Sequence, residues 1–481
     1  MSERPKGVVV AGLSSGSGKT VATMALLRGL SSRGFDVAPM KCGPDFIDPR
    51  FHEAVVSGPS YNLDMYFLSG DELGKRYGRF VEGRSGGVVE GVMGLFDGEA
   101  KKTATSDIAR TLGLPVILVI NAKGLAETVS ALVKGVLAHD PELAILGVIA
   151  TFTGSKRHGD ILREALEREG LPPLLGTIER DQALALPERH LGLVGAGELS
   201  RSGFLERFVE TLDTKVLPGF SWELIEPNFS RQESSPGVLP GEAPFFRAVH
   251  RSPNAILPRY RLGVAMDRAF CFYYPENMEM LLELGVLPVP FSPMEDPFLP
   301  EDLDGLFFGG GYPELYAEEL SRNQSMKESV RAFSATGAPV VGECGGFLYL
   351  TMGPKNREDD SELHDFVGLF PVRFLMGEKL RRLGYAEVSH PGSGPFSEAT
   401  GFVRGHIFHY SFLQKDLSEE VPLSPAFLRG GEDEGMMAGN TIGSYLHLYF
   451  PSNREYAASL VASLARQSAK KARATSFDEN L

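Results

Sequence analysis

The chain has 481 residues, of which 43% are hydrophobic and 23% charged, and its formal net charge is -14. This length favours two substantial domains, and the composition excludes an intrinsically disordered chain. The acidic balance argues against a nucleic-acid-binding protein, and three widely spaced cysteines, Cys42, Cys271 and Cys344, fit neither a disulfide framework nor a zinc site.

Signals for membrane insertion or secretion are poorly supported. No apolar run approaches the roughly 20 residues of a membrane span. The short apolar run 7–13 is soon interrupted by glycine, serine and Lys19, which does not suit a secretory signal. We therefore expect a cytoplasmic protein with neither a membrane nor a nucleic-acid partner, and we leave a homodimer open.

Short apolar segments alternate with helix-like stretches over residues 1–198. Runs rich in Val and Ile, with little polar alternation, suit a parallel sheet that is covered on both faces. This part of the chain is therefore predicted to be a doubly wound α/β domain. The predicted strands are 7–13, 37–41, 87–93, 115–121, 146–152 and 174–178.

The pattern changes over residues 199–259, which are rich in proline and hold the only tryptophan, Trp222, in a polar setting. We interpret this stretch as a linker with partial structure. Residues 260–466 are predicted to form a second α/β domain, and residues 467–481 a polar C-terminal tail. The strands predicted in the second domain are 261–266, 286–290, 305–308, 338–342 and 441–445.

A glycine-rich loop, Gly12-Leu-Ser-Ser-Gly-Ser-Gly-Lys-Thr20, follows the first strand and precedes a helical pattern. This context is typical of a P-loop, whose backbone N–H groups bind the phosphates of a nucleotide. Lys19 can reach the β and γ phosphates, and the Thr20 hydroxyl can hold Mg²⁺. The loop is a variant, because the first glycine of the common pattern would fall at position 13. The predicted phosphate-binding residues are Gly12, Ser15, Gly16, Ser17, Gly18, Lys19 and Thr20.

Acidic side chains follow two further strands of the first domain. Lys41 ends one strand, with Asp45 and Asp48 in the loop after it, and Glu90 ends another, with Asp97 beyond it. The carboxyl ends of parallel strands meet at one edge of the sheet, so these groups are expected near the loop. Carboxylates there hold Mg²⁺ or position a phosphate acceptor. Solvated acidic loops remain the alternative for Asp48 and Asp97.

Cys344 lies at a sharp glycine turn between a buried strand and a helix in the second domain. The helix N-terminus is expected to lower the pKa of the thiol, and the Gly345 N–H can point at a developing oxyanion. A triglycine loop upstream can offer a second N–H, at Gly310. The pattern predicts a cysteine nucleophile. A buried, inert cysteine is the alternative.

A cysteine nucleophile needs a histidine base. We predict His447, because it lies at the end of the last predicted strand, where strand ends deliver catalytic groups. The residue two positions later is Tyr449 and not a carboxylate, so the site is expected to be a dyad. The alternative bases are His364, His390, His406 and His409.

Together these motifs resemble the cobyrinic acid a,c-diamide synthases and their relatives that act on hydrogenobyrinic acid or nickel sirohydrochlorin. The resemblance rests on the glycine-rich loop, Lys-Cys-Gly-Pro-Asp-Phe-Ile-Asp-Pro (41–49), Glu-Gly-Val-Met-Gly-Leu-Phe-Asp-Gly (90–98), Leu-Pro-Glu-Arg-His-Leu-Gly-Leu (186–193), Glu-Cys-Gly-Gly-Phe-Leu-Tyr-Leu (343–350) and Gly-Ser-Tyr-Leu-His (443–447). It implies a P-loop domain similar to dethiobiotin synthetase and a class I glutaminase domain that lacks the usual triad glutamate.

The resemblance also implies a reaction and a set of roles. The a and c carboxylates of an anionic tetrapyrrole would be phosphorylated by MgATP, and ammonia from glutamine would displace the phosphate. The implied catalytic residues are Cys344, His447, Asp45, Asp48 and Asp97, the implied metal ligands are Thr20, Asp45 and Glu90, Lys41 joins the nucleotide site, and Gly310 and Gly345 form the oxyanion hole.

One position departs from the family pattern. The family commonly places a base-reading asparagine after Gly147-Val-Ile-Ala, and this chain has Thr151 there. Two alternatives stay open for the whole chain. One is a related tetrapyrrole amidotransferase, such as cobyric acid synthase. The other is a P-loop partitioning or switch ATPase, which would explain only the first half.

Overall fold

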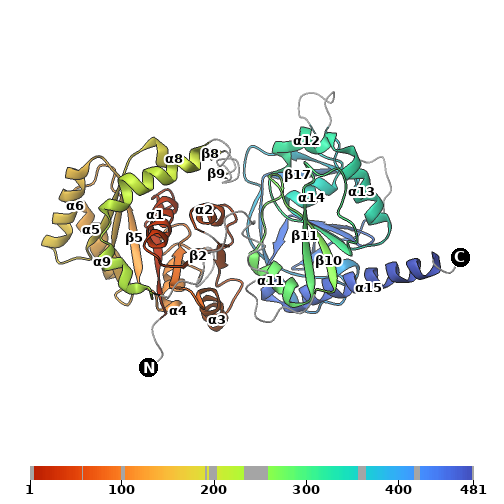
Figure 1. Cartoon of the computed structure of the whole chain (residues 1–481), viewed down its shortest axis with the longest axis horizontal. Helices are drawn as coiled ribbons and strands as arrows, with labels where there is room; N and C mark the ends of the chain where they lie inside the picture. Colours follow the sequence, from red (N-terminus) through yellow and green to blue (C-terminus); the bar gives the residue numbers. More distant parts are fainter. Residues whose placement is uncertain are drawn as a thin grey trace. The chain divides into compact units, whose positions relative to one another are not determined.

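The computed structural model describes residues 5–56, 58–98, 103–189, 192–193, 203–231, 258–355, 364–415 and 423–478. The chain divides into two compact units, residues 1–248 and 249–481. Each unit contains a central parallel sheet with helices packed on it (Figure 1). The predicted α/β class is confirmed for both halves.

The first unit contains a seven-stranded parallel sheet in the order β3-β2-β4-β1-β5-β6-β7. The strand order reverses around β1, so the carboxyl ends of β1, β2 and β4 lie next to one another, where such sheets bind ligands. Strand β3 was not predicted. The strands are β1 (Gly7–Gly12), β2 (Val37–Cys42), β3 (Tyr61–Leu63), β4 (Gly86–Glu90), β5 (Val116–Asn121), β6 (Ile145–Thr153) and β7 (Leu174–Glu179).

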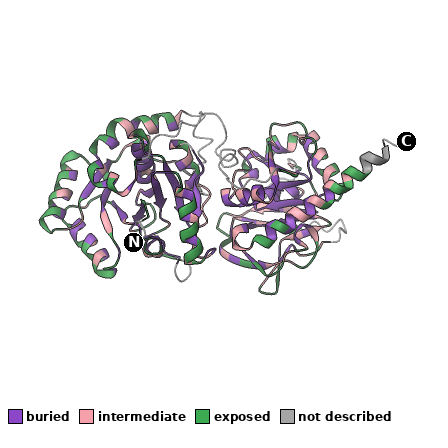
Figure 2. Cartoon of the chain, turned by 60° about the horizontal axis from the view of Figure 1, so that its bottom comes forward, coloured by how far each residue is buried: buried purple, intermediate pink, exposed green. Residues whose placement is uncertain are grey.

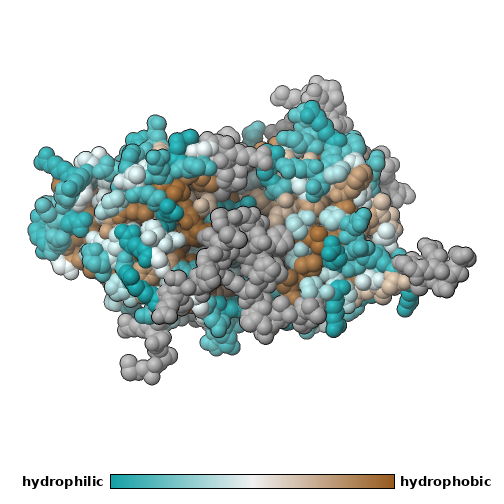
Figure 3. Space-filling model, viewed as in Figure 1, coloured by the Kyte–Doolittle hydropathy of each residue, from teal (hydrophilic) through white to brown (hydrophobic). Residues whose placement is uncertain are grey.

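The helices of this unit alternate with the strands, as a doubly wound fold requires. Helix α6 is strongly polar on its outer side, which appears as hydrophilic colour at the left edge of Figure 3. The connecting helices are α1 (Lys19–Ser32), α2 (Asp48–Val55), α3 (Gly70–Val81), α4 (Thr105–Leu112), α5 (Thr128–His139) and α6 (Lys156–Arg168). A 3-10 turn, η1 (Gln182–Leu184), and a two-stranded ribbon, β8 (Glu188–Arg189) with β9 (Gly192–Leu193), follow β7.

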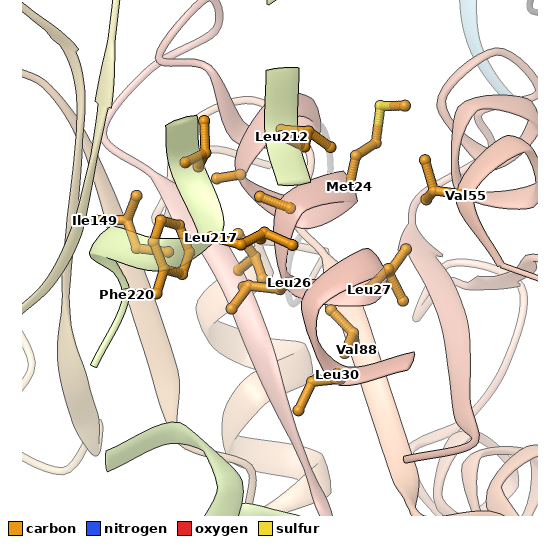
Figure 4. Packing of buried hydrophobic residues seen from close by; sticks show 14 of the residues in the cluster. Met24, Leu26, Leu27, Leu30, Val55, Val88, Ile149, Leu212, Leu217 and Phe220 are labelled. Atoms are coloured by element: carbon orange, nitrogen blue, oxygen red, sulfur yellow. The ribbon is translucent and has the colours of Figure 1, made fainter. Parts of the chain in front are cut away.

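Residues 203–231 belong to the core of the first unit, which corrects the prediction of a linker over 199–259. Trp222 is 7% exposed, its Nε1 donates a 3.0 Å hydrogen bond to the Leu217 carbonyl, and its ring packs so closely on α1 that a Cβ at Gly29 would lie 2.1 Å from it. Leu212, Leu217 and Phe220 join α1 and β6 side chains in one apolar cluster (Figure 4). The segment forms α8 (Phe204–Thr211), the π-helical η2 (Leu212–Val216), η3 (Leu217–Gly219), α9 (Trp222–Ile225) and η4 (Glu226–Asn228).

The second unit has a six-stranded sheet in the order β11-β10-β12-β13-β21-β20. Its strands are parallel except β20, which pairs antiparallel with β21. In Figure 2 the strands are buried, whereas the outer faces of the helices are exposed. The strands are β10 (Tyr260–Ala265), β11 (Val286–Phe291), β12 (Gly305–Phe308), β13 (Val340–Glu343), β20 (Met436–Ala438) and β21 (Thr441–Ser444).

Two antiparallel sheets of the second unit were not predicted. One pairs β14 with β17, and the other has the order β19-β18-β15-β16-β22. His447 therefore lies on β22, an edge strand separated from β21 by Tyr445, and not at the end of a parallel strand. The strands are β14 (Val372–Met376), β15 (Arg382–Ser389), β16 (Phe402–His409), β17 (Ser411–Lys415), β18 (Phe427–Arg429), β19 (Glu432–Glu434) and β22 (Leu446–Leu448).

The last helix continues to Asp478, so the predicted tail from 467 onward is helical over its described part. Gln467 is 7% exposed, and its amide donates to the Thr336 hydroxyl at 3.1 Å. Among the described residues no helix combines the length and apolar composition that crossing a membrane requires. The helices of this unit are α11 (Pro275–Glu283), η5 (Pro313–Tyr316), α12 (Ala317–Arg322), α13 (Gln324–Ala335), α14 (Gly345–Leu350), η6 (Gly394–Phe396), η7 (Phe450–Ser452) and α15 (Arg454–Asp478).

Candidate active site

The glycine-rich loop joins β1 to α1, as predicted. Gly16 and Gly18 have φ values of 72° and 84°, a left-handed conformation that glycine adopts without strain. Lys19 lies across the loop, and its Nζ donates to the Ser14 carbonyl at 3.0 Å and to the Met93 carbonyl at 2.7 Å. The amine can therefore reach a ligand over the loop only by exchanging these two carbonyls for the ligand's oxygens.

Four side chains beside the loop form one buried polar cluster. The Thr20 hydroxyl donates to Glu90 Oε1 at 2.9 Å and lies 3.4 Å from Asp48 Oδ1. Lys41 Nζ lies 2.6 Å from Asp48 Oδ2 and 3.1 Å from Glu90 Oε1. His52, which the sequence analysis missed, holds the other oxygen of Glu90 at 2.7 Å. The ends of β2 and β4 and the first turns of α1 and α2 thus bring two carboxylates, a hydroxyl and an ammonium together.

Charge pairing sets the protonation of this cluster. Burial alone would lower the pKa of Lys41, but the charges of Asp48, Glu90 and Asp45 outweigh it and raise that pKa. Burial likewise disfavours the Glu90 carboxylate, yet Lys41 and His52 hold its pKa well below the usual range. Burial raises the pKa of Asp48, and Lys41 opposes the shift. The cluster is a buried ion network whose ammonium occupies the space between two carboxylates.

Two predicted carboxylates serve the backbone instead. Asp45 Oδ1 accepts the N–H groups of Ile47 at 2.8 Å and Asp48 at 3.3 Å, and its Oδ2 lies 3.9 Å from Lys41. Asp97 Oδ2 accepts the Gly94 N–H at 3.0 Å, and the residue is exposed. Asp48, and not Asp45, is the second carboxylate next to Thr20.

A cavity of about 820 Å³ extends from the loop across the sheet edge. Of the predicted loop residues, Gly12 and Ser17 do not line it; the Ser17 side chain is 2% exposed. Phe152, 39% exposed with a φ of 54°, also lines the cavity. The sequence analysis missed the lining at the end of β7 and in the segment after it, which comprises Ile178, Glu179, Arg180, Asp181, Gln182, Leu184, Ala185 and Leu186.

Thr151 occupies the position of the family's base-reading asparagine, and its side chain is used internally. Its hydroxyl donates to the Ser17 carbonyl at 2.7 Å, and its methyl group would lie 3.0 Å from a Cβ at Gly18. Thr151 therefore packs against the glycine-rich loop and hydrogen-bonds to its backbone. The exposed side chain at this point of the cavity is that of its neighbour, Phe152.

The donor set beside the loop suits a hard cation that is also bound by phosphate. Within the described ranges no three His, Cys, Asp or Glu side chains cluster as a metal site. Mg²⁺ usually takes only one or two protein carboxylates together with phosphate oxygens and water. The oxygens of Thr20, Asp48 and Glu90 fit that requirement.

Cys344 has the strained backbone of a nucleophile elbow. It follows β13 directly and precedes α14, and its φ of 47° is unusual for a residue with a side chain. A Cβ at Gly346 would lie 2.0 Å from the Phe308 carbonyl, so the turn accepts only glycine there. The sulfur lies 3.7 Å from the Phe408 carbonyl on β16. The predicted turn geometry is observed.

The expectation of a lowered thiol pKa is wrong for the free protein. Burial raises the pKa of Cys344 to about 12, and the charge of Glu314 adds to this. The Gly345 amide donates to the sulfur but offsets only part of the shift. Helix α14 spans six residues, Gly345–Leu350, so its dipole is short. The thiol stays protonated until a base removes its proton.

His447 is the buried histidine next to the triglycine loop. It is 2% exposed, and a Cβ at Gly310 would lie 2.3 Å from its Cε1. Burial lowers its pKa to about 3, so the ring is neutral near pH 7. The Gly310 carbonyl accepts the N–H groups of Cys271 at 2.9 Å and Phe272 at 3.0 Å, which fixes the loop. The predicted base and oxyanion loop thus lie together.

The alternative bases have other roles in the structure. His406 is the cross-strand neighbour of His447 on β16. His409 stacks on Tyr445 at 3.7 Å between ring centroids, and its Nδ1 bonds the Ser411 carbonyl at 2.8 Å. His390 Nδ1 accepts the Gly392 N–H at 3.0 Å, and His364 Nδ1 lies 3.3 Å from the Ser321 hydroxyl.

Comparison with known proteins assigns a family to each half. Residues 8–194 match the family model of the CobQ/CobB/MinD/ParA nucleotide binding domain. Residues 261–455 match that of the CobB/CobQ-like glutamine amidotransferase domain. The first family also includes MinD and ParA, but the second match shows that the chain carries a glutamine amidotransferase domain as well.

Curated relatives match along nearly the whole chain. Cobyrinate a,c-diamide synthase of Syntrophotalea carbinolica is 41% identical over 458 residues, which cover 92% of this chain and 95% of that protein. The protein of the same name from Dehalococcoides mccartyi is 38% identical over 462 residues, covering 94% and 97% of the two chains. The one from Synechocystis is 35% identical over 452 residues, covering 92% and 90%.

Proposed function

The chain belongs to the cobyrinate a,c-diamide synthase family, and we propose that it converts the a and c carboxylates of cobyrinic acid to amides with ATP and glutamine. One observation carries the proposal: the chain holds both a phosphate loop with buried oxygen ligands and a cysteine elbow with a neutral histidine. A partitioning ATPase needs only the first of these sites. Joining an activated carboxylate to nitrogen taken from glutamine requires both sites.

The first unit is proposed to activate the carboxylate. Lys19 would leave the carbonyls of Ser14 and Met93 to bind phosphate oxygens, and the loop N–H groups would bind the remaining ones. Thr20, Asp48 and Glu90 would hold Mg²⁺. Bound MgATP supplies the phosphoryl group that turns the carboxylate into an acyl phosphate, with a good leaving group on the carbonyl carbon.

Lys41 is proposed to serve as a positive charge inside this site. It is 2% exposed and lies within 3.1 Å of both Asp48 and Glu90. Once a cation neutralises these carboxylates, the ammonium is available for the phosphoryl oxygens. The fixed charge would then stabilise the negative charge that is transferred.

The second unit is proposed to release ammonia from glutamine. Cys344 gives its proton to His447 and attacks the amide carbon, while the N–H groups of Gly345 and Gly310 stabilise the oxyanion. His447 returns the proton to the leaving ammonia, and a water molecule that it deprotonates hydrolyses the thioester to glutamate. Ammonia then attacks the acyl phosphate, which forms the amide and releases phosphate.

The compartment and the exact substrate are part of the proposal. Cys42, Cys271 and Cys344 all lie in the described part of the chain and form no disulfide, and a nucleophilic thiol needs reducing conditions, so we place the protein in the cytoplasm. Hydrogenobyrinic acid, nickel sirohydrochlorin and cobyric acid precursors are the alternative acceptors. Mass spectrometry of the products formed from each tetrapyrrole with MgATP and glutamine identifies the acceptor and the number of amides.

Two substitutions test whether the first unit activates the carboxylate and the second unit releases ammonia. We expect Cys344→Ala to abolish amidation driven by glutamine and to keep amidation driven by added ammonium. Lys19→Ala should lose both, because both need the activated carboxylate. Product formation is measured with each nitrogen source. Equal loss of both reactions in the cysteine variant would refute the assignment of separate tasks to the two units.

A further inference from the structure

The strand that carries His447 is held at its outer edge by side chains. Among the described strands, β22 pairs with β16 alone. On the other edge, the Leu448 N–H donates to Glu343 Oε1 at 3.1 Å, and the Leu448 carbonyl accepts from Asn277 Nδ2 at 2.7 Å. Edge strands leave such groups unpaired unless something covers them. Here both outward groups of one residue are satisfied by buried side chains.

Asn277 also holds the next stretch of backbone. Its Oδ1 accepts the Phe450 N–H at 2.8 Å, and the residue is 2% exposed. On the inner edge, the Tyr449 N–H donates to the Arg404 carbonyl at 2.9 Å. The backbone that follows His447 is therefore fixed on both edges, with α11 supplying one anchor and β13 the other.

Glu343 connects the two reacting residues along the chain. It is the last residue of β13 and directly precedes Cys344, while Leu448 directly follows His447. Its hydrogen bond to Leu448 thus joins the neighbour of the nucleophile to the neighbour of the base. Any shift of β22 along or away from β13 has to break this bond.

A ring-binding carboxylate at the usual triad position is lacking. Tyr449, two residues after His447, is 1% exposed and packs its ring against Tyr274 at 5.2 Å between centroids. In a triad a third group orients the base through the imidazole. Tyr449 has no carboxylate to do so.

We propose that Glu343 and Asn277 are positioning residues that fix the strand of His447 relative to the turn of Cys344 by clamping the backbone of Leu448. They perform through the backbone the task that a triad carboxylate performs through the imidazole. The inference rests on the proposed glutaminase reaction, and it assigns the two residues no contact with glutamine.

The clamp at Glu343 works as a neutral acceptor. Burial raises the pKa of Glu343 to about 8, and the Leu448 N–H opposes the shift only in part. Near pH 7 the side chain is therefore mainly a carboxylic acid, which accepts the hydrogen bond without a charge. A glutamine side chain has the same shape and the same acceptor.

The first test compares Glu343→Gln with Glu343→Leu in the full chain. We expect the glutamine variant to keep kcat for glutamine hydrolysis within about threefold. The leucine variant removes the acceptor, and displacement of a reacting group costs about 100-fold, so its kcat should fall that far with an unchanged KM for glutamine. Amidation with ammonium, which does not use Cys344, should stay at the wild-type rate in both variants.

The second test uses Asn277→Ala with Asn440→Ala as its matched control. The Asn440 amide also donates to a backbone carbonyl, that of Gly337 at 3.0 Å, but it lies at the start of β21, at the opposite end of that strand from the nucleophile. We expect Asn277→Ala to lower kcat at least tenfold and Asn440→Ala to leave it unchanged.

The outcomes separate the clamp from the function that it serves. Wild-type protein that amidates with ammonium but never hydrolyses glutamine would refute the proposed function. Wild-type activity in both Glu343→Leu and Asn277→Ala would overturn the clamp alone. If kcat for glutamine hydrolysis falls equally in Glu343→Gln and Glu343→Leu, Glu343 does not act as a neutral acceptor. If Glu343→Leu also loses the ammonium reaction, the test rests on Asn277→Ala and its control Asn440→Ala. Equal kcat values for glutamine hydrolysis in these two variants would overturn the proposal.

Discussion

The Thr20 hydroxyl donates a 2.9 Å hydrogen bond to Glu90 Oε1, which links the phosphate loop to the end of β4. Thr20 follows the loop lysine, and Glu90 is 0% exposed. Because Lys41 also reaches Glu90, one carboxylate holds the loop, the neighbouring strand β2 and, through His52, helix α2. The sheet edge beside the phosphate loop is therefore organised around Glu90.

Asp48 and Asp45 should differ in their effect on the magnesium requirement. Asp48 lies 3.4 Å from Thr20, so Asp48→Asn removes one of the proposed cation ligands. We expect it to raise the Mg²⁺ concentration for half-maximal activity about tenfold or more. In Asp45→Asn, the control, an amide oxygen can still accept the N–H of Ile47. ATP-dependent amidation with ammonium, titrated with Mg²⁺, measures both. Equal effects would contradict the assignment.

The Cys344 thiol should react slowly at neutral pH when glutamine is absent. Its pKa, raised by burial to about 12, leaves little thiolate at pH 7. We expect the alkylation rate with iodoacetamide to rise about tenfold per pH unit from about pH 7 to 10. Mass spectrometry of the Cys344 peptide gives the rate, and the half-buried Cys271, alkylated in the same samples, is the comparison thiol. A plateau near pH 7 would show a preformed thiolate.

Glu343 should make stability depend on pH. Its pKa is about 8 in the folded protein against an ordinary 4.5, so its contribution is fully present below about pH 4.5 and is lost as pH rises through about 8. Each pKa unit corresponds to about 1.4 kcal/mol. We expect the Tm of the wild type to fall relative to Glu343→Gln across that window, as calorimetry can measure. Parallel Tm curves would contradict a buried, protonated Glu343.

Trp222 should stabilise the first unit. Its ring packs on α1, and Arg33 lies over it at 4.0 Å from the centroid. We expect Trp222→Ala to cost about 3 to 5 kcal/mol of unfolding free energy. Leu224→Ala, at a 40% exposed position on the same short helix, should cost little. Denaturant unfolding followed by circular dichroism measures both. A small effect at Trp222 would mean that residues 203–231 are dispensable.

Much of the fold followed from local pattern. The apolar runs of both parallel sheets lie close to the observed strands, because a strand buried on both faces needs a continuous apolar sequence. The two antiparallel sheets of the second unit, one of which carries His447, were not predicted. Their short, half-polar strands depend on cross-strand partners far along the chain. The segment 203–231 was assigned to a linker for a similar reason: its prolines are a local signal, whereas its burial depends on α1.

By itself, the sequence determined two sharp turns, the glycine-rich loop at Lys19 and the elbow at Cys344. Each is one contiguous stretch, and its backbone conformation accepts only particular residues, such as glycine, at particular positions. Only the tertiary structure decided that Asp48 rather than Asp45 accompanies Thr20, that the Cys344 thiol is protonated, and that Glu343 holds the strand of His447. These facts depend on burial and on contacts between distant segments, which change pKa values and geometry without a local signature.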